Sequence, residues 1–221
     1  MSFFSKLFGG GASQSRADSE AAGERVPRRS NGLAELAKFI QREGSCTVLD
    51  LGPTSPANIT YFTNLGARSY TEDVLHSSKN PEYLVKNADG QTVIDPDKFL
   101  TDNLAYDAET FDAVLCWDTA DYMNEGLVKP VVQRVHKIMK PKGLLLAFFH
   151  TKDAGGDTPY YRYHIGSNDT LEMQPIARSS ANHFKLQRVF NNRHIENLFH
   201  DYGSIKFFLG RDNIREVLIV R

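Results

Sequence analysis

Residues that could bind a ligand follow several apolar runs of the sequence. They are Asp50-Leu51-Gly52, Glu72-Asp73, Trp117-Asp118 and His150. The runs that precede them have the length and composition of β-strands. In an open parallel sheet, ligands bind at the carboxyl ends of the strands, where the strand order reverses. We therefore expect these residues to lie close together and to form the binding site.

Two of the acidic positions have a spacing with chemical meaning. Glu72 lies 22 residues beyond Asp50. At about this distance a carboxylate meets the ribose hydroxyls of an adenosine-containing ligand in a doubly wound fold. Asp73 is the immediate neighbour of Glu72, so either could take that role. The structural alternatives are that Asp50 caps the end of its strand and that Glu72 is a solvated loop carboxylate.

The elements that must position these residues alternate along the chain. Strands are predicted at 46–51, 68–73, about 99–104, 111–117, 144–149, 204–209 and 216–220. Helices are predicted at 31–44, 57–65, 81–86, 128–139 and 193–202, and 151–182 is predicted to be irregular. This alternation favours an α/β fold: a Rossmann-like three-layer α/β/α sandwich with a mostly parallel seven-stranded sheet and an antiparallel C-terminal hairpin.

The first thirty residues differ from the rest. Between Gly9 and Arg25 the sequence has no large apolar residue, so this stretch cannot offset the entropy cost of ordering. We predict a disordered tail at 1–30 and one domain at 31–221. Residues 1–8 contain three phenylalanines, one leucine and one lysine, which could form a short amphipathic helix touching a membrane surface or a partner. The alternative is a frayed terminus.

Composition excludes several classes of protein. The chain has 221 residues, a formal charge of −1, 41% hydrophobic and 24% charged residues, typical of an ordinary globular domain. No charge excess indicates a nucleic-acid partner, and no His or Cys cluster has the spacing of metal ligands. Cys46 and Cys116 are expected to be buried free thiols. The longest apolar run, 144–149, is too short to span a bilayer, and the start resembles no secretory signal, so a cytoplasmic location is expected.

Four segments together resemble a known family. They are Val48-Leu49-Asp50-Leu51-Gly52, Thr71-Glu72-Asp73, the stretch from Leu104 to Leu115, and Met139-Lys140-Pro141-Lys142-Gly143. In order and spacing they are similar to the first motif, the ribose-binding acid, the fourth strand and the turn before the fifth strand of class I S-adenosylmethionine-dependent methyltransferases. The resemblance covers 31–221 and is poor over 151–190.

The resemblance implies S-adenosylmethionine as the cofactor and assigns roles to several residues. Asp50 and Gly52 would orient the methionine portion of the cofactor. Glu72 or Asp73 would bind the ribose, and Asp102 or Asn103 would lie near the adenine. Trp117 and Asp118, which follow the fourth strand, would border the methyl group and the acceptor. The implied cofactor-binding residues are Asp50, Gly52, Glu72, Asp73, Asp102, Trp117 and Asp118.

One departure from the family pattern concerns the first loop. The family has further glycines after the first, whereas this chain has Pro53-Thr54-Ser55-Pro56. Glycine lets the backbone approach a ligand, and proline removes an N–H donor. Either the loop adopts another shape, or cofactor binding is weakened and the protein is a noncatalytic relative that binds a partner. A nicotinamide-dependent oxidoreductase is disfavoured because Gly-x-Gly-x-x-Gly is absent.

Candidate substrate residues lie after the fifth predicted strand. His150 and the run Tyr160-Tyr161-Arg162-Tyr163-His164 face the same predicted cleft and could form a lid or a substrate wall. Of these, His150, Tyr161 and Arg162 are the substrate-side candidates, for a small-molecule acceptor. Methyl transfer needs alignment and desolvation, and a base only when the nucleophile starts protonated. The sequence therefore assigns no catalytic residue.

Overall fold

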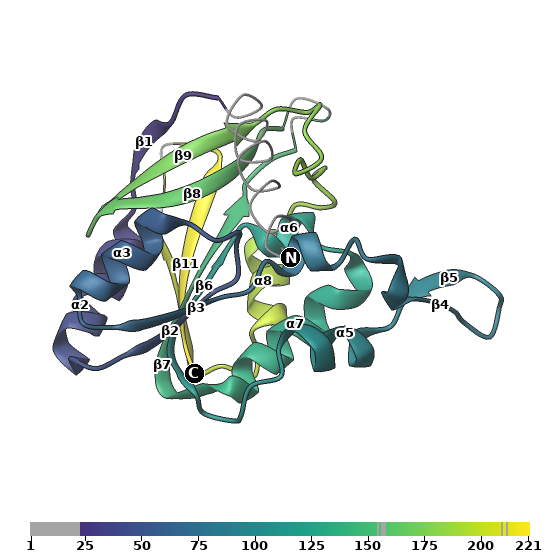
Figure 1. Ribbon diagram of the computed structural model, residues 1–221, viewed down its shortest axis with the longest axis horizontal. Coiled ribbons are helices and arrows are strands. Elements are labelled where there is room, and N and C mark those ends of the chain that lie inside the picture. The colour runs from purple at the N-terminus through teal and green to yellow at the C-terminus, as the bar shows by residue number, and fades with distance from the viewer. Residues whose placement is uncertain (1–22, 154, 156–157, 209, 211) are drawn as a thin grey trace, which may run out of the picture.

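The computed structural model describes residues 23–221, except 154, 156–157, 209 and 211 (Figure 1). The strands are β1 Val26–Arg29, β2 Thr47–Asp50, β3 Arg68–Thr71, β4 Leu84–Lys86, β5 Thr92–Ile94, β6 Phe111–Trp117, β7 Met139–His150, β8 Tyr160–Ser167, β9 Thr170–Ile176, β10 Ser204–Phe208 and β11 Ile214–Val220. The helices are α2 Asn31–Glu43, α3 Pro56–Asn64, α4 Val74–Ser77, η1 Pro81–Tyr83, α5 Pro96–Asn103, α6 Thr119–Tyr122, α7 Glu125–Ile138 and α8 Asn192–Leu198. Within this described part of the chain, no helix is long and apolar enough to cross a membrane.

The main sheet has the order β10-β11-β7-β6-β2-β3. β3, β2, β6 and β7 run parallel, and β11 pairs antiparallel with both β7 and β10. The predicted mostly parallel α/β sheet with an antiparallel C-terminal hairpin is therefore confirmed. Its strands number six in the described chain, not seven.

The strand expected at about 99–104 is wrong, because this segment belongs to α5. Asp95 caps the helix by accepting hydrogen bonds from the backbone N–H groups of Asp97 and Lys98, both at 3.1 Å. Pro96 occupies the first helical turn, where its missing N–H costs nothing. This Asp-Pro start signal outweighs the apolar residues that suggested a strand.

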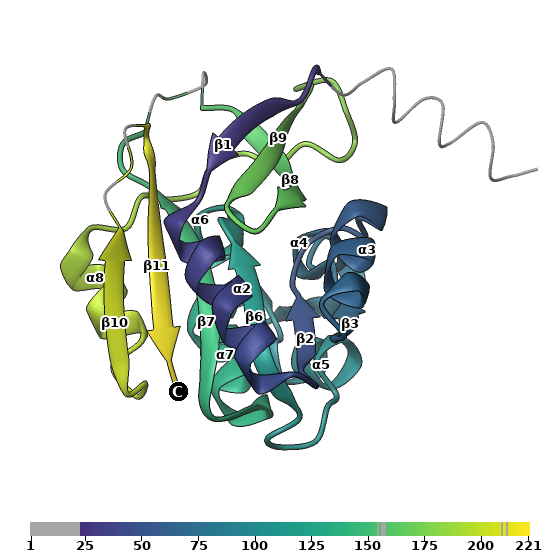
Figure 2. The ribbon, with the colours of Figure 1, turned by 90° about the vertical axis from the view of Figure 1, so that its left-hand side faces the viewer.

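Helices cover both faces of the main sheet, as Figure 2 shows. On β2, Val48 packs into the cluster that contains α2 and α3, whereas Leu49 packs into the cluster that contains α5, α7 and α8. The same alternation holds for Leu145 and Leu146 on β7. Strand side chains point alternately to the two faces, so a sheet buried on both sides has a continuous apolar sequence.

A second sheet, of order β1-β9-β8, corrects two predictions. Val26–Arg29, expected in the tail, pairs antiparallel with β9. Residues 160–176, expected to be irregular, form the β8–β9 hairpin. The domain therefore begins before residue 31, and the N-cap of α2 is Ser30. The remainder of the predicted tail, 1–22, lies outside the described residues.

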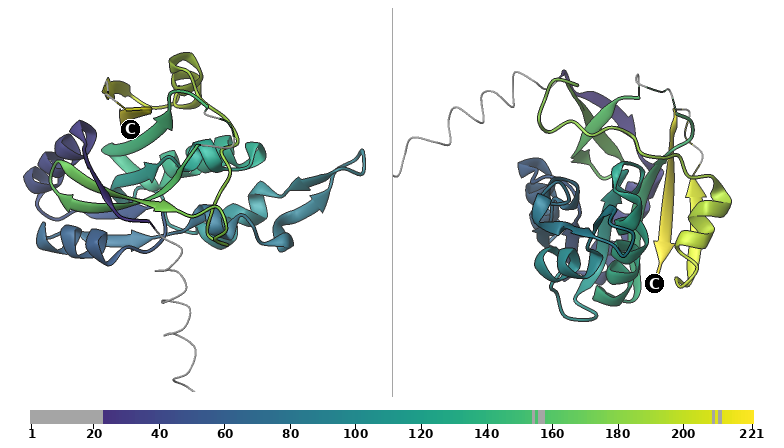
Figure 3. Two further views of the ribbon diagram at one scale, coloured as in Figure 1. Left: turned by 90° about the horizontal axis from the view of Figure 1, so that it is seen from above. Right: turned by 90° about the vertical axis from the view of Figure 1, so that its right-hand side faces the viewer.

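The second sheet covers the carboxyl-end edge of the main sheet. In Figure 2 it lies above the ends of β2 and β6. β8 is tied to the start of α3 because the Asn58 side-chain oxygen accepts a hydrogen bond from the Ile165 backbone N–H at 2.8 Å. On the other side of the molecule, the predicted helix 81–86 is the short turn η1 followed by β4, and the β4–β5 hairpin projects from the body (Figures 1 and 3).

Candidate functional site

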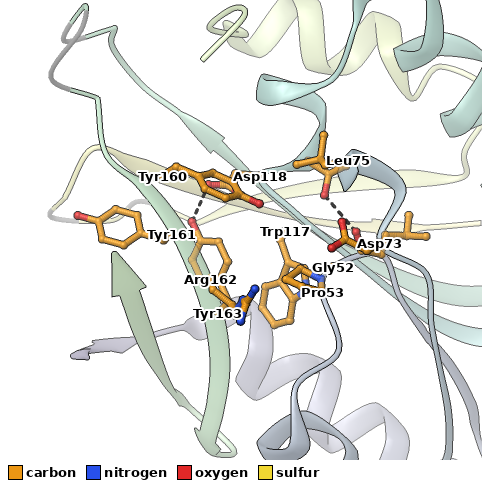
Figure 4. A pocket seen from close by; sticks show the side chains of 12 residues that line it. Gly52, Pro53, Asp73, Leu75, Trp117, Asp118, Tyr160, Tyr161, Arg162 and Tyr163 are labelled. Atoms are coloured by element: carbon orange, nitrogen blue, oxygen red, sulfur yellow. Dashed lines mark hydrogen bonds between the residues drawn. The ribbon is translucent and has the colours of Figure 1, made fainter. Parts of the chain in front are cut away.

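A pocket lies where β2, β3 and β6 end, beneath β8 (Figure 4). Its described lining comprises Leu51, Gly52, Pro53, Asp73, Leu75, Trp117, Asp118, Thr119 and Tyr160, Tyr161, Arg162 and Tyr163. The residues after three separate strands therefore meet, as the sheet rule requires. Six of the predicted site residues are in this lining: Gly52, Asp73, Trp117, Asp118, Tyr161 and Arg162.

The Asp50 carboxylate lies under the pocket floor and is 2% exposed. One oxygen accepts hydrogen bonds from the Gly52 backbone N–H at 3.2 Å and from Trp117 Nε1 at 2.6 Å. The other accepts one from Asn58 Nδ2 at 2.9 Å. Burial raises the pKa of Asp50, and these three donors oppose the rise. Both carboxylate oxygens of Asp50 are therefore hydrogen-bonded to other groups of the chain.

Gly52 lies close against Trp117, and a side chain there would press on the indole. A Cβ atom at Gly52 would lie 3.0 Å from Cδ1 and 3.1 Å from Nε1 of the indole. The following loop turns into α3 through Ser55, whose side chain accepts a hydrogen bond from the Asn58 backbone N–H, with Pro56 in the first turn. Ser55 Oγ also contacts His164 Nδ1 of β8 at 2.8 Å. The proline-containing loop thus holds the covering sheet.

Trp117 and Tyr163 lie against each other in the pocket lining. Their rings are stacked, with centroids 5.2 Å apart and an angle of 7° between the planes. The Tyr163 hydroxyl donates a hydrogen bond to Asp118 Oδ2 at 2.8 Å. The volume left is about 10 Å³. This is room for about one water molecule, whereas cofactor pockets have volumes of about 300–1,000 Å³.

The two acids after β3 lie differently. Asp73 lines the pocket, and its Oδ1 accepts a hydrogen bond from the His76 backbone N–H at 3.0 Å, which caps α4. Glu72 accepts a hydrogen bond from the Tyr106 hydroxyl and is not in the described lining. The geometry favours Asp73 over Glu72 as the acid that a ligand would meet.

A buried charged cluster lies behind the pocket. The Asp121 side chain is fully buried, and its Oδ2 accepts hydrogen bonds from the His150 backbone N–H at 2.6 Å and from His150 Nδ1 at 2.9 Å. Burial raises the pKa of Asp118 to about 7, a rise supported by Asp121 and opposed by His150 and Tyr163. His150 is 3% exposed and belongs to this cluster, so the structure does not place it against a substrate.

Asp102 lies away from the pocket, on α5. Its carboxylate is exposed and 4.0 Å from the Lys98 ammonium group. Asp102 was placed near the adenine through the mistaken third strand, and its position on a helix explains the difference. The neighbouring Asn103 donates hydrogen bonds to the Tyr83 hydroxyl and to the Phe99 carbonyl, at 3.0 and 2.9 Å.

Three residues important to this site were not found from the sequence. Asn58 connects Asp50 to β8, Tyr163 stacks on Trp117, and Asp121 fixes His150. Tyr163 lies in the aromatic run that the sequence singled out, and no local signal marks the other two. Their roles depend on partners far away in the sequence.

A methionine–adenosine cofactor fits this site in its chemistry. Gly52, Asp73 and Asp118, which the sequence resemblance assigns to the methionine portion, the ribose and the methyl group, line one pocket. The free volume between Trp117, Tyr163 and the other lining residues, about 10 Å³, is far smaller than such a cofactor needs. Among the residues placed in the structure, no group of His, Cys, Asp and Glu could hold a metal ion.

No protein-family model and no curated protein matches the chain. Several solved structures are similar in backbone trace. A SAM-dependent methyltransferase from Archaeoglobus fulgidus is 10% identical, with 86% of this chain and 92% of that one covered and a TM-score of 0.49. An S-adenosylmethionine-dependent methyltransferase from Mesorhizobium loti is 13% identical, with 86% and 95% covered and a TM-score of 0.45.

A third similar structure is the Burkholderia thailandensis 1,6-didemethyltoxoflavin-N1-methyltransferase, with 1,6-didemethyltoxoflavin and S-adenosylhomocysteine bound. It is 11% identical, with 86% of this chain and 77% of that one covered and a TM-score of 0.44. The strand arrangement of the present chain, four parallel strands followed by an antiparallel hairpin, is the mostly parallel α/β sheet expected from the sequence.

Proposed function

We propose that the chain is an S-adenosylmethionine-dependent methyltransferase acting on a small-molecule acceptor. One observation carries the proposal: the ends of β2, β3 and β6 contribute Gly52, Asp73 and Asp118 to one pocket. This is the place where doubly wound sheets bind nucleotide-containing ligands. The cytoplasmic location stays a prediction.

Each pocket residue has a proposed task. Asp73 accepts hydrogen bonds from the ribose hydroxyls, and the Leu51-Gly52 backbone supports the methionine portion. The cofactor, when bound, supplies a methyl group on a sulfonium. Tyr161 and Arg162 of β8 line the same pocket and are proposed to bind the acceptor. The covering sheet excludes water, which favours transfer by alignment and desolvation.

A second candidate is a noncatalytic methyltransferase-like protein that binds a partner. The filled pocket favours it, because Trp117 and Tyr163 leave about 10 Å³ free. Calorimetric titration with S-adenosylmethionine, S-adenosylhomocysteine and NAD separates the candidates. Binding of the first two ligands supports the methyltransferase, binding of NAD alone an oxidoreductase, and binding of none the noncatalytic protein.

Asp73→Asn is expected to weaken binding of S-adenosylhomocysteine about tenfold. The variant keeps a side-chain oxygen to cap α4 but loses the charge, and hydrogen bonds to a charged group are about 1 kcal/mol stronger than neutral ones. Glu72→Gln is the matched control, because Glu72 is bonded to Tyr106. Calorimetry measures both. A tenfold loss in Glu72→Gln with none in Asp73→Asn would assign the ribose to Glu72 instead.

A further inference from the structure

We infer that Trp117 and Tyr163 form an autoinhibitory plug, which competes with the cofactor for the pocket and must leave before the cofactor binds. This inference rests on the proposed function and concerns the regulation of the same site. The plug is not loose packing. Its two rings lie parallel within the pocket lining, and the edge of Phe148 contacts both, with centroids 5.7 Å from Trp117 and 5.3 Å from Tyr163.

Each ring of the plug donates a hydrogen bond to a carboxylate that the sequence resemblance assigns to the cofactor site. Trp117 Nε1 donates to Asp50 Oδ1 at 2.6 Å, and the Tyr163 hydroxyl donates to Asp118 Oδ2 at 2.8 Å. Both carboxylates are at most 3% exposed. Asp118 lines the pocket, so the closed arrangement satisfies a group that a ligand there would contact, as a competing internal ligand must do.

The backbone at Trp117 is strained. Its φ angle is 46°, in the left-handed region that bulky L-residues rarely adopt. Such strain persists only where surrounding contacts enforce it, and it is concentrated at functional sites and switches. Release of Tyr163 would remove one of the contacts that hold Trp117 in this conformation, so the two rings are expected to move together.

Tyr163 lies on β8, which is anchored to the loop and helix that follow β2. The Asn58 amide donates to the Tyr163 carbonyl at 3.4 Å and accepts from the Ile165 N–H at 2.8 Å, and Ser55 contacts His164 at 2.8 Å. These contacts come from the loop and helix that follow β2, where the family has glycines. The loop that departs from the family's glycine pattern therefore belongs to the segment that anchors β8 and the covering sheet.

A closed majority state weakens apparent binding by a factor equal to the reciprocal of the open fraction. The apparent dissociation constant is the intrinsic one divided by the open fraction, so a 1% open population weakens binding a hundredfold. Tyr163→Ala removes one ring and the bond to Asp118, and leaves the residues proposed to bind the cofactor in place. We expect it to bind S-adenosylhomocysteine at least tenfold more tightly than the unchanged chain, measured by calorimetry.

Tyr163→Phe is a second variant, which keeps the ring and loses only the hydrogen bond; a smaller gain in affinity is expected. Tyr202→Phe is its matched control, because the buried Tyr202 hydroxyl donates to the Val132 carbonyl at 3.0 Å on the other face of the sheet. Equal affinity in the unchanged chain, Tyr163→Ala and Tyr163→Phe would overturn the plug and leave the proposed function standing. No binding by any of these folded proteins at millimolar ligand would overturn the proposed function, and the plug with it.

Discussion

Arg28→Ala is expected to lower the free energy of unfolding by about 3–5 kcal/mol. The Arg28 guanidinium is paired with the Glu216 carboxylate, and the two side chains are 7% and 4% exposed. Removal of one partner leaves an uncompensated charge in the interior, which is the costly way to break a buried pair. The remaining donors to Glu216, the Gly32 backbone N–H at 2.6 Å and the Ser30 hydroxyl at 3.0 Å, carry no charge.

Urea unfolding measures this loss, and Arg25→Ala is the control. Arg25 pairs with Glu172 on the same second sheet, but the side chains are 46% and 42% exposed, so a change below about 1 kcal/mol is expected. Replacement of both buried partners, Arg28→Met with Glu216→Leu, should recover only part of the stability, because it leaves the Gly32 N–H and the Ser30 hydroxyl without their acceptor. A loss in Arg28→Ala no larger than that in Arg25→Ala would contradict the account of β1 as part of the domain.

Asp121→Ala is expected to cost a similar amount, about 3–5 kcal/mol. Burial lowers the pKa of His150, but the hydrogen bond to Asp121 and the charges of Asp118 and Asp121 outweigh it, so that the net pKa is raised. Without Asp121, both the ring Nδ1 and the backbone N–H of His150 lose their acceptor. The imidazole is then left in the interior without its counter-charge.

The chain offers an exposed counterpart of this pair. His200 Nε2 lies 3.0 Å from Asp201 Oδ1, and the side chains are 58% and 51% exposed. Asp201→Ala should therefore change the free energy of unfolding by less than about 1 kcal/mol in the same urea experiment. Similar losses in the two alanine variants would show that the buried pair contributes no more than a surface one.

The central strands were predictable because their signal is local. Residues 46–51, 111–117 and 144–149 are apolar runs that match β2, β6 and the second half of β7. The sheet rule then brought Gly52, Asp73 and Trp117 to one place without any tertiary information. The predictions held where a short stretch of sequence decides both the element and its burial.

The covering sheet was not predictable because its partners are distant in sequence. β1 has one exposed valine, one proline and two arginines, a composition that indicates a polar tail. Its pairing partner, β9, is more than 140 residues away, and the buried charge of Arg28 is compensated by Glu216, 188 residues away. Strand formation here depends on tertiary contacts, which local propensity does not encode.

Fluorescence of Trp117 during titration with S-adenosylhomocysteine tests whether the cofactor binds in the pocket that Trp117 lines. Trp117 is the only tryptophan of the chain, and it lies in the pocket, bonded to Asp50 and stacked on Tyr163. A cofactor that enters this pocket must displace the indole. We expect a saturable change in emission, with the same dissociation constant as calorimetry gives. Heat of binding without a change in emission would place the ligand elsewhere in the molecule. The absence of both signals at millimolar ligand would show that the pocket does not bind this cofactor. Either result would contradict the proposed site.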